Sequence, residues 1–214
     1  IAHGLVGSEM CIRDSYCGVV GYKPTYGLIS RNGVLRTSYS LDHIGMFGRK
    51  VEDVAMLAKV LIKKDKFDPA TIHYSTENIL NETKKGPLFE PKFIFYKTDH
   101  WKIIDKKSKE SFEYFIKSFN KNIEIFDTPS YFKDIHKYHQ IIHETDLANN
   151  FSVYFKKFKK KLSKYMQDAI TRGNKYSAKE YAEAIDFMKR SYESYQEVFE
   201  AVSYTHLRAH ETMS

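Results

Sequence analysis

The sequence predicts an α/β protein, and three stretches of the chain carry this prediction. Residues 93–96 are four consecutive apolar or aromatic residues, which is typical of a buried strand. Residues 105–120 place apolar side chains at helical spacing, and a second short apolar run follows at 123–126. A strand, a helix and a strand in this order predict two parallel strands joined by a helical crossover.

The N-terminal part is expected to combine short strands with one helix. Residues 18–22 and 27–30 are the predicted strands, and 31–33 form the turn after the second. The helix is predicted after Lys50 because its apolar residues recur at helical spacing. These residues are Val51, Val54, Ala55, Ala58, Leu61 and Ile62.

From Tyr131 onward the pattern is helical almost throughout. The best-marked helix starts at Ser177, with Glu180 completing a capping box, and runs to about residue 199. Its predicted apolar stripe consists of Tyr181, Ala184, Ile185, Met188, Tyr192 and Tyr195. The sequence shows neither an internal repeat nor a Gly/Ser-rich linker, which predicts a single domain.

Residues 17–53 contain several Gly and Pro residues, which are typical of turns, and an ordered series of motifs. The chain reads CGVVG at 17–21, KPTYG at 23–27, SLDHIG at 40–45 and GRKVED at 48–53. In this order the motifs resemble those of the amidase-signature hydrolases. The resemblance implies an α/β/α fold with a mixed central sheet, and cleavage of carbon–nitrogen (amide) bonds by a serine nucleophile. It implies neither a metal nor another cofactor.

The two ends of the chain are interpreted as having a different origin from the rest of the sequence. One DNA sequence, read on its two strands, encodes LVGSEMCIRD at 5–14 and VSYTHLRAHET at 202–212, and it resembles a sequencing adaptor. Residues 1–14 and 202–214 are therefore expected to be adaptor-derived, and residues 15–201 to be an internal fragment of an amidase domain. The fragment is expected to be unstable alone.

The family's catalytic groups are expected to lie outside this chain. The resemblance places the nucleophilic serine in a DTGGS segment directly before CGVVG, and places a lysine and a bridging serine further upstream. That lysine takes the serine proton through the bridging serine, and backbone N–H groups hold the oxyanion. No catalytic, cofactor-binding or metal-binding residue is therefore predicted here, and the fragment is predicted to be inactive. Gly18, Gly21, Gly27 and Pro24 are expected to pack the scaffold, and Asp42 with Gly45 to shape a turn.

Four other groups of residues are candidates for a site. His139 and His143 share a helix face near His136 and Glu144, but the Glu of HExxH is missing. Ser38 or Ser40 with Asp42 and His43 is expected to form turn-stabilising hydrogen bonds rather than a triad. Lys23 stands at the wrong place for the family's lysine. Cys17 is expected to be a small buried strand residue and not a nucleophile.

Two parent enzymes fit the resemblance. One is a stand-alone amidase acting on a small-molecule amide, which KTDHW at 97–101 favours. The other is the glutaminase subunit of a tRNA-dependent amidotransferase, in which ETDLANN at 144–150 would be followed by a YDG motif that this chain lacks.

The basic balance of the chain raises a third possibility. The formal net charge is +7, and residues 151–166 alternate lysines with aromatic residues, as in a non-enzymatic basic module that binds RNA or a membrane surface. Lysine is abundant along the whole chain, so these lysines are expected to solvate a helix face. We therefore expect no nucleic-acid partner and no membrane partner. A cytoplasmic location is also expected.

Overall fold

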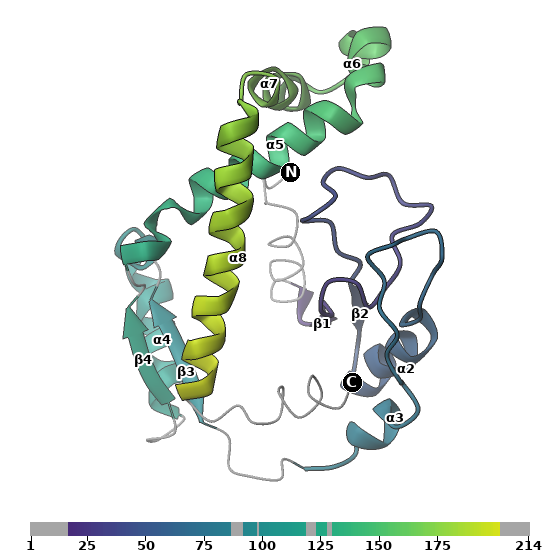
Figure 1. Ribbon diagram of the computed structural model, residues 1–214. Coiled ribbons are helices and arrows are strands. Elements are labelled where there is room, and N and C mark those ends of the chain that lie inside the picture. Colours follow the sequence, from purple (N-terminus) through teal and green to yellow (C-terminus); the bar gives the residue numbers. More distant parts are fainter. Residues whose placement is uncertain (1–16, 87–91, 98, 119–122, 128–129, 202–214) are drawn as a thin grey trace. The chain divides into compact units, whose positions relative to one another are not determined.

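The computed structural model describes residues 17–86, 92–97, 99–118, 123–127 and 130–201 (Figure 1). The flanks 1–14 and 202–214, predicted to be adaptor-derived, lie outside the described residues. The chain divides into two compact units. The first unit comprises the described residues up to Gly86 together with His143–Asn174, and the second unit comprises the other described residues.

The first unit is built from short strands and helices. Its elements are β1 (Val20–Tyr22), β2 (Met46–Gly48), α2 (Val51–Leu61), α3 (Ile79–Glu82), the C-terminal half of α5 (Ile135–Asn150), α6 (Ser152–Phe158), the 3₁₀ turn η3 (Lys159–Lys161) and α7 (Lys164–Gly173). Strands β1 and β2 pair antiparallel, with Tyr22 opposite Met46. They form a two-stranded sheet.

Two strand predictions in this unit need correction. The first strand begins at Val20 rather than at residue 18, because Gly18 adopts a positive φ of 60° that interrupts the extended backbone. Residues 27–30 are not a strand, since Ile29 makes only an isolated bridge with Ile62. The partner of β1 is instead β2, a three-residue strand too short to show an apolar alternation.

Helix α2 begins where the sequence predicted it. The backbone N–H of Lys50 donates to the carboxylate of Asp53 at 3.1 Å, which fixes the first turn. Its buried residues Val54 and Ala58 belong to a cluster that also contains Leu28, Ile29, Met46 and Ile62. Val51 and Leu61, which the prediction placed in the same stripe, are exposed, so the buried stripe is narrower than predicted.

The second cluster of this unit lies where α7 packs on α5. It consists of Leu147, Ala148, Phe151, Ala169 and Ile170. A Cβ added to Gly173 would stand 1.9 Å from the backbone oxygen of Glu144, so only glycine fits at this crossing. The carboxylate of the buried Glu144 receives three hydrogen bonds from Arg172, which joins the same two helices.

The second unit contains the predicted strand–helix–strand arrangement. Its elements are β3 (Phe93–Lys97), the 3₁₀ turn η1 (Asp99–Lys102), α4 (Lys106–Ser118), β4 (Ile123–Asp127), the 3₁₀ turn η2 (Ser130–Asp134), the N-terminal half of α5 and α8 (Ala178–Ala201). Strands β3 and β4 pair in parallel, from Phe93 opposite Ile123 to Lys97 opposite Asp127, and lie beside α4 in Figure 1. The prediction of a parallel α/β unit is confirmed.

Helix α8 confirms its predicted start and corrects its predicted face. The N–H of Ser177 donates to the Glu180 carboxylate at 2.8 Å, and the N–H of Glu180 donates back to the Ser177 hydroxyl at 3.2 Å, which is a capping box. Tyr192 is 58% exposed, so its place in the apolar stripe was wrong. The buried face instead includes Phe187 and Ser191.

Stacked aromatic rings explain why α8 turns this face inward. The ring of Phe187 stacks on Tyr131 and Tyr138, with centroids 5.0 and 4.4 Å apart. The ring of Phe132 lies 4.6 Å from that of Tyr195. Among the described helices, none is both long and apolar enough to cross a bilayer.

Candidate functional site

The motif segment folds as a set of turns within the first unit. After β1 and Pro24 the chain turns at Tyr26 and Gly27, and Gly27 has a φ of 88°. A Cβ on Gly27 would lie 2.3 Å from the backbone oxygen of Ala70, and the Gly27 carbonyl accepts a hydrogen bond from the Ile72 N–H at 3.0 Å. The expectation that Gly27 permits close backbone packing is confirmed. Around Gly18, by contrast, there is open space, so its role is the positive φ.

A buried ion pair fixes the next part of the segment. The Asp68 carboxylate accepts three hydrogen bonds from Arg31, from the backbone N–H at 2.9 Å and from Nε and Nη2 at 3.0 Å each. The two side chains are only 4% and 1% exposed. Side-chain hydrogen bonds from Arg31 are the main reason why the pKa of Asp68 lies well below its usual range.

The guanidinium of Arg31 also organises the aromatic residues around it. It lies 4.7 Å from the ring centroid of Tyr26 and 5.1 Å from that of Tyr39. Its Nη1 donates to the backbone oxygen of Tyr39. One buried cation therefore connects the turns on both sides of it with Asp68.

The predicted turn around Asp42 is held by a second set of hydrogen bonds. The Asp42 carboxylate accepts from the backbone N–H groups of Thr37 and Ser38, at 2.8 and 3.0 Å, and from the Thr37 hydroxyl. The fully buried Ser38 hydroxyl accepts from the Leu41 N–H at 3.2 Å. These contacts are the turn-stabilising bonds that the sequence predicted for Asp42 and Ser38.

Helix α5, more than 100 residues further along the chain, also forms hydrogen bonds to this turn. The Ser38 hydroxyl donates to Asp146, whose carboxylate also accepts the Tyr39 N–H at 3.1 Å. The side-chain amide of Asn150, one helical turn further on, donates to the Thr37 backbone oxygen at 3.1 Å. We call these two residues and the turn of residues 37–42 the clamped turn.

Two histidines of this unit, His43 and His143, are half-buried. The Nδ1–H of His43 donates to the backbone oxygen of Leu41 at 2.8 Å. Burial lowers the pKa of His43. Burial also lowers the pKa of His143, although nearby carboxylates, Asp42 first among them, act to raise it. The structure thus gives the side chains of Ser38, Asp42 and His43 different hydrogen-bond partners.

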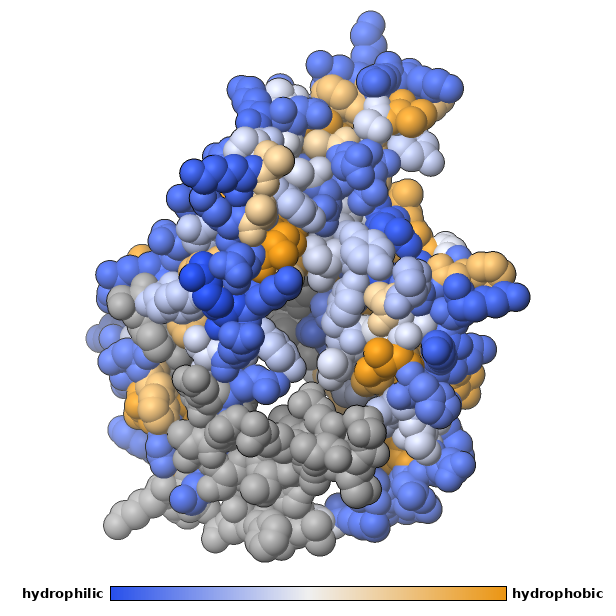
Figure 2. All heavy atoms as spheres, in the orientation of Figure 1, coloured by the Kyte–Doolittle hydropathy of each residue, from blue (hydrophilic) through white to orange (hydrophobic). Residues whose placement is uncertain are grey.

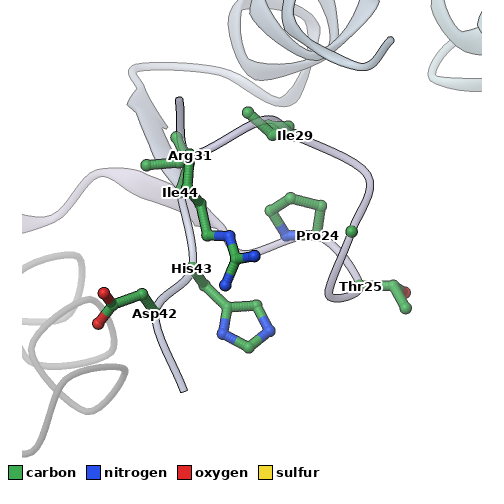
Figure 3. Close-up of a pocket in the computed structure, with 8 residues that line it drawn as sticks. Pro24, Thr25, Ile29, Arg31, Asp42, His43 and Ile44 are labelled. Atoms are coloured by element: carbon green, nitrogen blue, oxygen red, sulfur yellow. The ribbon is translucent and has the colours of Figure 1, made fainter. Parts of the chain in front are cut away.

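The hollow beside these residues is small. It has a volume of about 10 Å³, the space of a single water molecule, and Figure 3 shows the Arg31 guanidinium and the His43 ring in it. It is lined by Pro24, Thr25, Gly27, Ile29, Arg31, Asp42, His43 and Ile44. An amide substrate would not fit in this hollow.

The other candidates from the sequence are Cys17, Lys23 and the histidine group with Glu144. Cys17 is exposed and precedes β1, which corrects the prediction of a buried strand residue; the positive φ of Gly18 separates it from the strand. Lys23 is exposed. Glu144 of the histidine group is engaged by Arg172, and the described residues contain no cluster of three His, Cys, Asp or Glu side chains suited to a metal.

The sequence did not reveal the ion pair or the α5 contacts. Arg31 and Asp68 are 37 positions apart, and Ser38 and Asp146 are 108 apart.

The fold and this scaffold define an α/β protein whose N-terminal motifs form hydrogen-bonded turns and whose second half is largely helical. The chain belongs to the amidase family, because the family model described as Amidase matches residues 14–206.

Curated relatives are most similar over short stretches. The A subunit of glutamyl-tRNA(Gln) amidotransferase from Mycoplasma genitalium is 52% identical over 64 residues, which are 30% of this chain and 13% of that protein. The protein of the same name from Clostridium botulinum is 36% identical over 104 residues, which are 47% of this chain and 21% of that protein. The matches thus span about a fifth or less of these relatives.

Solved structures share the fold along most of the chain. A structure described as revealing the origins of an s-triazine catabolic enzyme has a TM-score of 0.77 at 16% identity, over 90% of this chain and 42% of that chain. The 6-aminohexanoate cyclic dimer hydrolase in complex with substrate has a TM-score of 0.71 at 17% identity, over 92% and 44%. The predicted amidase-signature fold is confirmed.

Proposed function

We propose that residues 15–201 are part of an amide hydrolase that cleaves carbon–nitrogen bonds of a small-molecule amide with a serine nucleophile. The observation that carries this proposal is the family match over residues 14–206, together with the motif scaffold of residues 17–53. In this proposal residues 1–14 and 202–214 are translated adaptor, and the parent enzyme is cytoplasmic.

The chemistry explains why the scaffold needs groups from elsewhere. A serine hydroxyl is a weak nucleophile near neutral pH and must lose its proton as it attacks an amide carbonyl. In the described residues Ser38 is buried in the clamped turn and Lys23 is exposed, so neither side chain has the surroundings of an activated nucleophile or a neutral base. The role of this chain is to support the catalytic loop that the family carries directly before Cys17.

A second candidate is the glutaminase subunit of a tRNA-dependent amidotransferase. It is favoured by the names of the curated relatives, which are 36% and 52% identical over their matched stretches. The stand-alone hydrolase is favoured by KTDHW at 97–101 and by the absence of a YDG motif after residue 150.

Recovery of the genomic DNA on both sides of codons 15–201 tests the proposal. We expect GGSSGGS and DTGGS segments upstream of Cys17; ordinary coding sequence without them would refute the hydrolase. The completed protein then separates the two candidates. A stand-alone amidase hydrolyses a model anilide by itself, whereas a glutaminase subunit releases ammonia from glutamine with its partner subunits.

A further inference from the structure

The segment between two acidic residues of the first unit has an unusual charge pattern. From residue 147 to residue 167 the chain contains no Asp or Glu, but it contains six lysines. These are Lys156, Lys157, Lys159, Lys160, Lys161 and Lys164. Lys164 pairs with Asp168 at 2.9 Å, whereas among the described residues no carboxylate forms an ion pair with the other five. Helix α6 and the turn η3 therefore carry a local excess of positive charge.

Exposed apolar side chains share this surface with the lysines. Val153 is 57% exposed, and Tyr154 and Phe158 are each 47% exposed. Figure 2 shows hydrophobic and hydrophilic side chains next to each other over α6. The nearby Phe155 and Leu162 instead pack against the core cluster, so the inward side of the segment is already occupied.

Helical geometry places the exposed residues on one side of α6. With 100° per residue, Val153, Lys157, Tyr154 and Phe158 fall within a sector of about 140°. Lys161 extends the same side into η3, and its Nζ lies 5.6 Å from the Phe158 ring centroid. We call this side of α6 and η3 the basic face. On this face lysines and apolar side chains are exposed to water together.

We propose that the basic face binds the surface of an anionic lipid bilayer. Lysine ammonium groups are attracted to acidic headgroups, and valine, tyrosine and phenylalanine side chains gain free energy by entering the boundary between headgroups and acyl chains. The sequence alone favours a solvated helix face, and the exposure of Val153, Tyr154 and Phe158 is the added observation. This surface is independent of the proposed amide hydrolysis.

The residue types favour lipid over RNA as the partner. Residues 151–166 contain no arginine, the side chain best suited to bidentate phosphate contacts and to stacking on bases. Val153, the most exposed apolar residue of the face, has no ring to stack on a base. An anionic bilayer, by contrast, makes use of both point charges and aliphatic side chains.

Co-sedimentation of the full chain with lipid vesicles tests the proposal. We expect binding to vesicles of phosphatidylcholine with phosphatidylserine, weakened by salt, and much weaker binding to vesicles of phosphatidylcholine alone. The triple variant Lys157→Gln, Lys160→Gln, Lys161→Gln should bind about a hundredfold less tightly, at about fivefold per lysine. The double variant Tyr154→Ser, Phe158→Ser should lose about tenfold at unchanged net charge.

A second lysine group of the same chain supplies the matched control. Lys106, Lys107 and Lys109 of α4 are also exposed, but Lys106 faces Glu110 across one helical turn at 3.8 Å. Their triple replacement by Gln removes the same charge and should leave vesicle binding within about threefold. Far-UV circular dichroism checks that every variant keeps the helical content of the parent chain.

Three outcomes would overturn the proposal. The first is an equal loss in both triple variants, which would assign binding to net charge alone. The second is no binding to anionic vesicles. The third is salt-sensitive binding of the chain to single-stranded RNA without binding to vesicles, which would assign the basic face to nucleic acid.

Discussion

Replacement of Asp68 with alanine should destabilise the first unit by about 3–5 kcal/mol. Arg31 is 4% exposed, and Asp68 supplies the acceptor for three of its hydrogen bonds. Without that carboxylate a guanidinium stays buried with its charge uncompensated, which costs much more than the pair itself contributes. The free energy of unfolding, measured by urea titration with far-UV circular dichroism, is the quantity to compare.

An exposed pair of the same unit gives the control. Lys85 and Glu82 are 2.6 Å apart with side chains 59% and 48% exposed, so Glu82→Ala should cost at most about 1 kcal/mol. The double variant Arg31→Met, Asp68→Leu removes both charges and should recover much of the loss. An Asp68→Ala variant that unfolds no more easily than Glu82→Ala would refute the reasoning.

Acid should remove the contribution of this ion pair. Because the pKa of Asp68 is depressed in the folded state, its stabilisation is complete above the unfolded pKa of about 3.9 and is lost as the pH falls from there towards the folded pKa. The stability difference between the parent chain and Asp68→Asn should therefore be constant near neutral pH and should shrink below about pH 4. A difference that does not change with pH in acid would contradict this account.

Three further predictions concern the clamped turn, the α5–α7 crossing and catalysis. Ser38→Ala should lower the free energy of unfolding in urea by about 1.5–3 kcal/mol, because it removes a hydrogen bond to the Asp146 carboxylate. Ser40→Ala should be neutral or stabilising, because the buried Ser40 hydroxyl has no partner in the described residues. Equal effects of the two variants would count against the role of Ser38 in the clamped turn. Gly173→Ala should lower the thermal midpoint by several degrees because its Cβ would meet the Glu144 backbone, while Gly86→Ala, with open space around it, should change the midpoint little. The purified chain should hydrolyse no model anilide, and measurable turnover that copurifies with it would disprove the assignment of the catalytic groups to other segments.

Local patterns predicted the elements that depend on neighbours in sequence. The parallel pair β3 and β4 follows from two apolar runs around an amphipathic helix, and the start of α8 follows from Ser177 and Glu180. Strand β2 was missed because three residues cannot show a period. Tyr192 was misplaced because the buried face of α8 is set by rings from η2 and α5, which stack on Phe187.

The sequence predicted the turns of the candidate site but not the long-range contacts that hold them. The motif order indicated that Asp42 shapes a turn, and the structure shows its three hydrogen bonds. The pairing of Arg31 with Asp68 and of the turn with α5 depends on tertiary structure, and no periodicity in a single sequence encodes it.

The separation between the two halves of the clamped turn has a consequence for synthesis on the ribosome. Asp146 follows Ser38 by 108 residues and Asn150 follows Thr37 by 113. At about 5–20 residues per second, translation needs roughly 5–20 s to supply α5 after the turn has been made. Until then the turn has only its bonds to residues made earlier, among them those to Asp42 and the bond from Arg31 to Tyr39, so the final order of the motif segment is reached late in chain elongation.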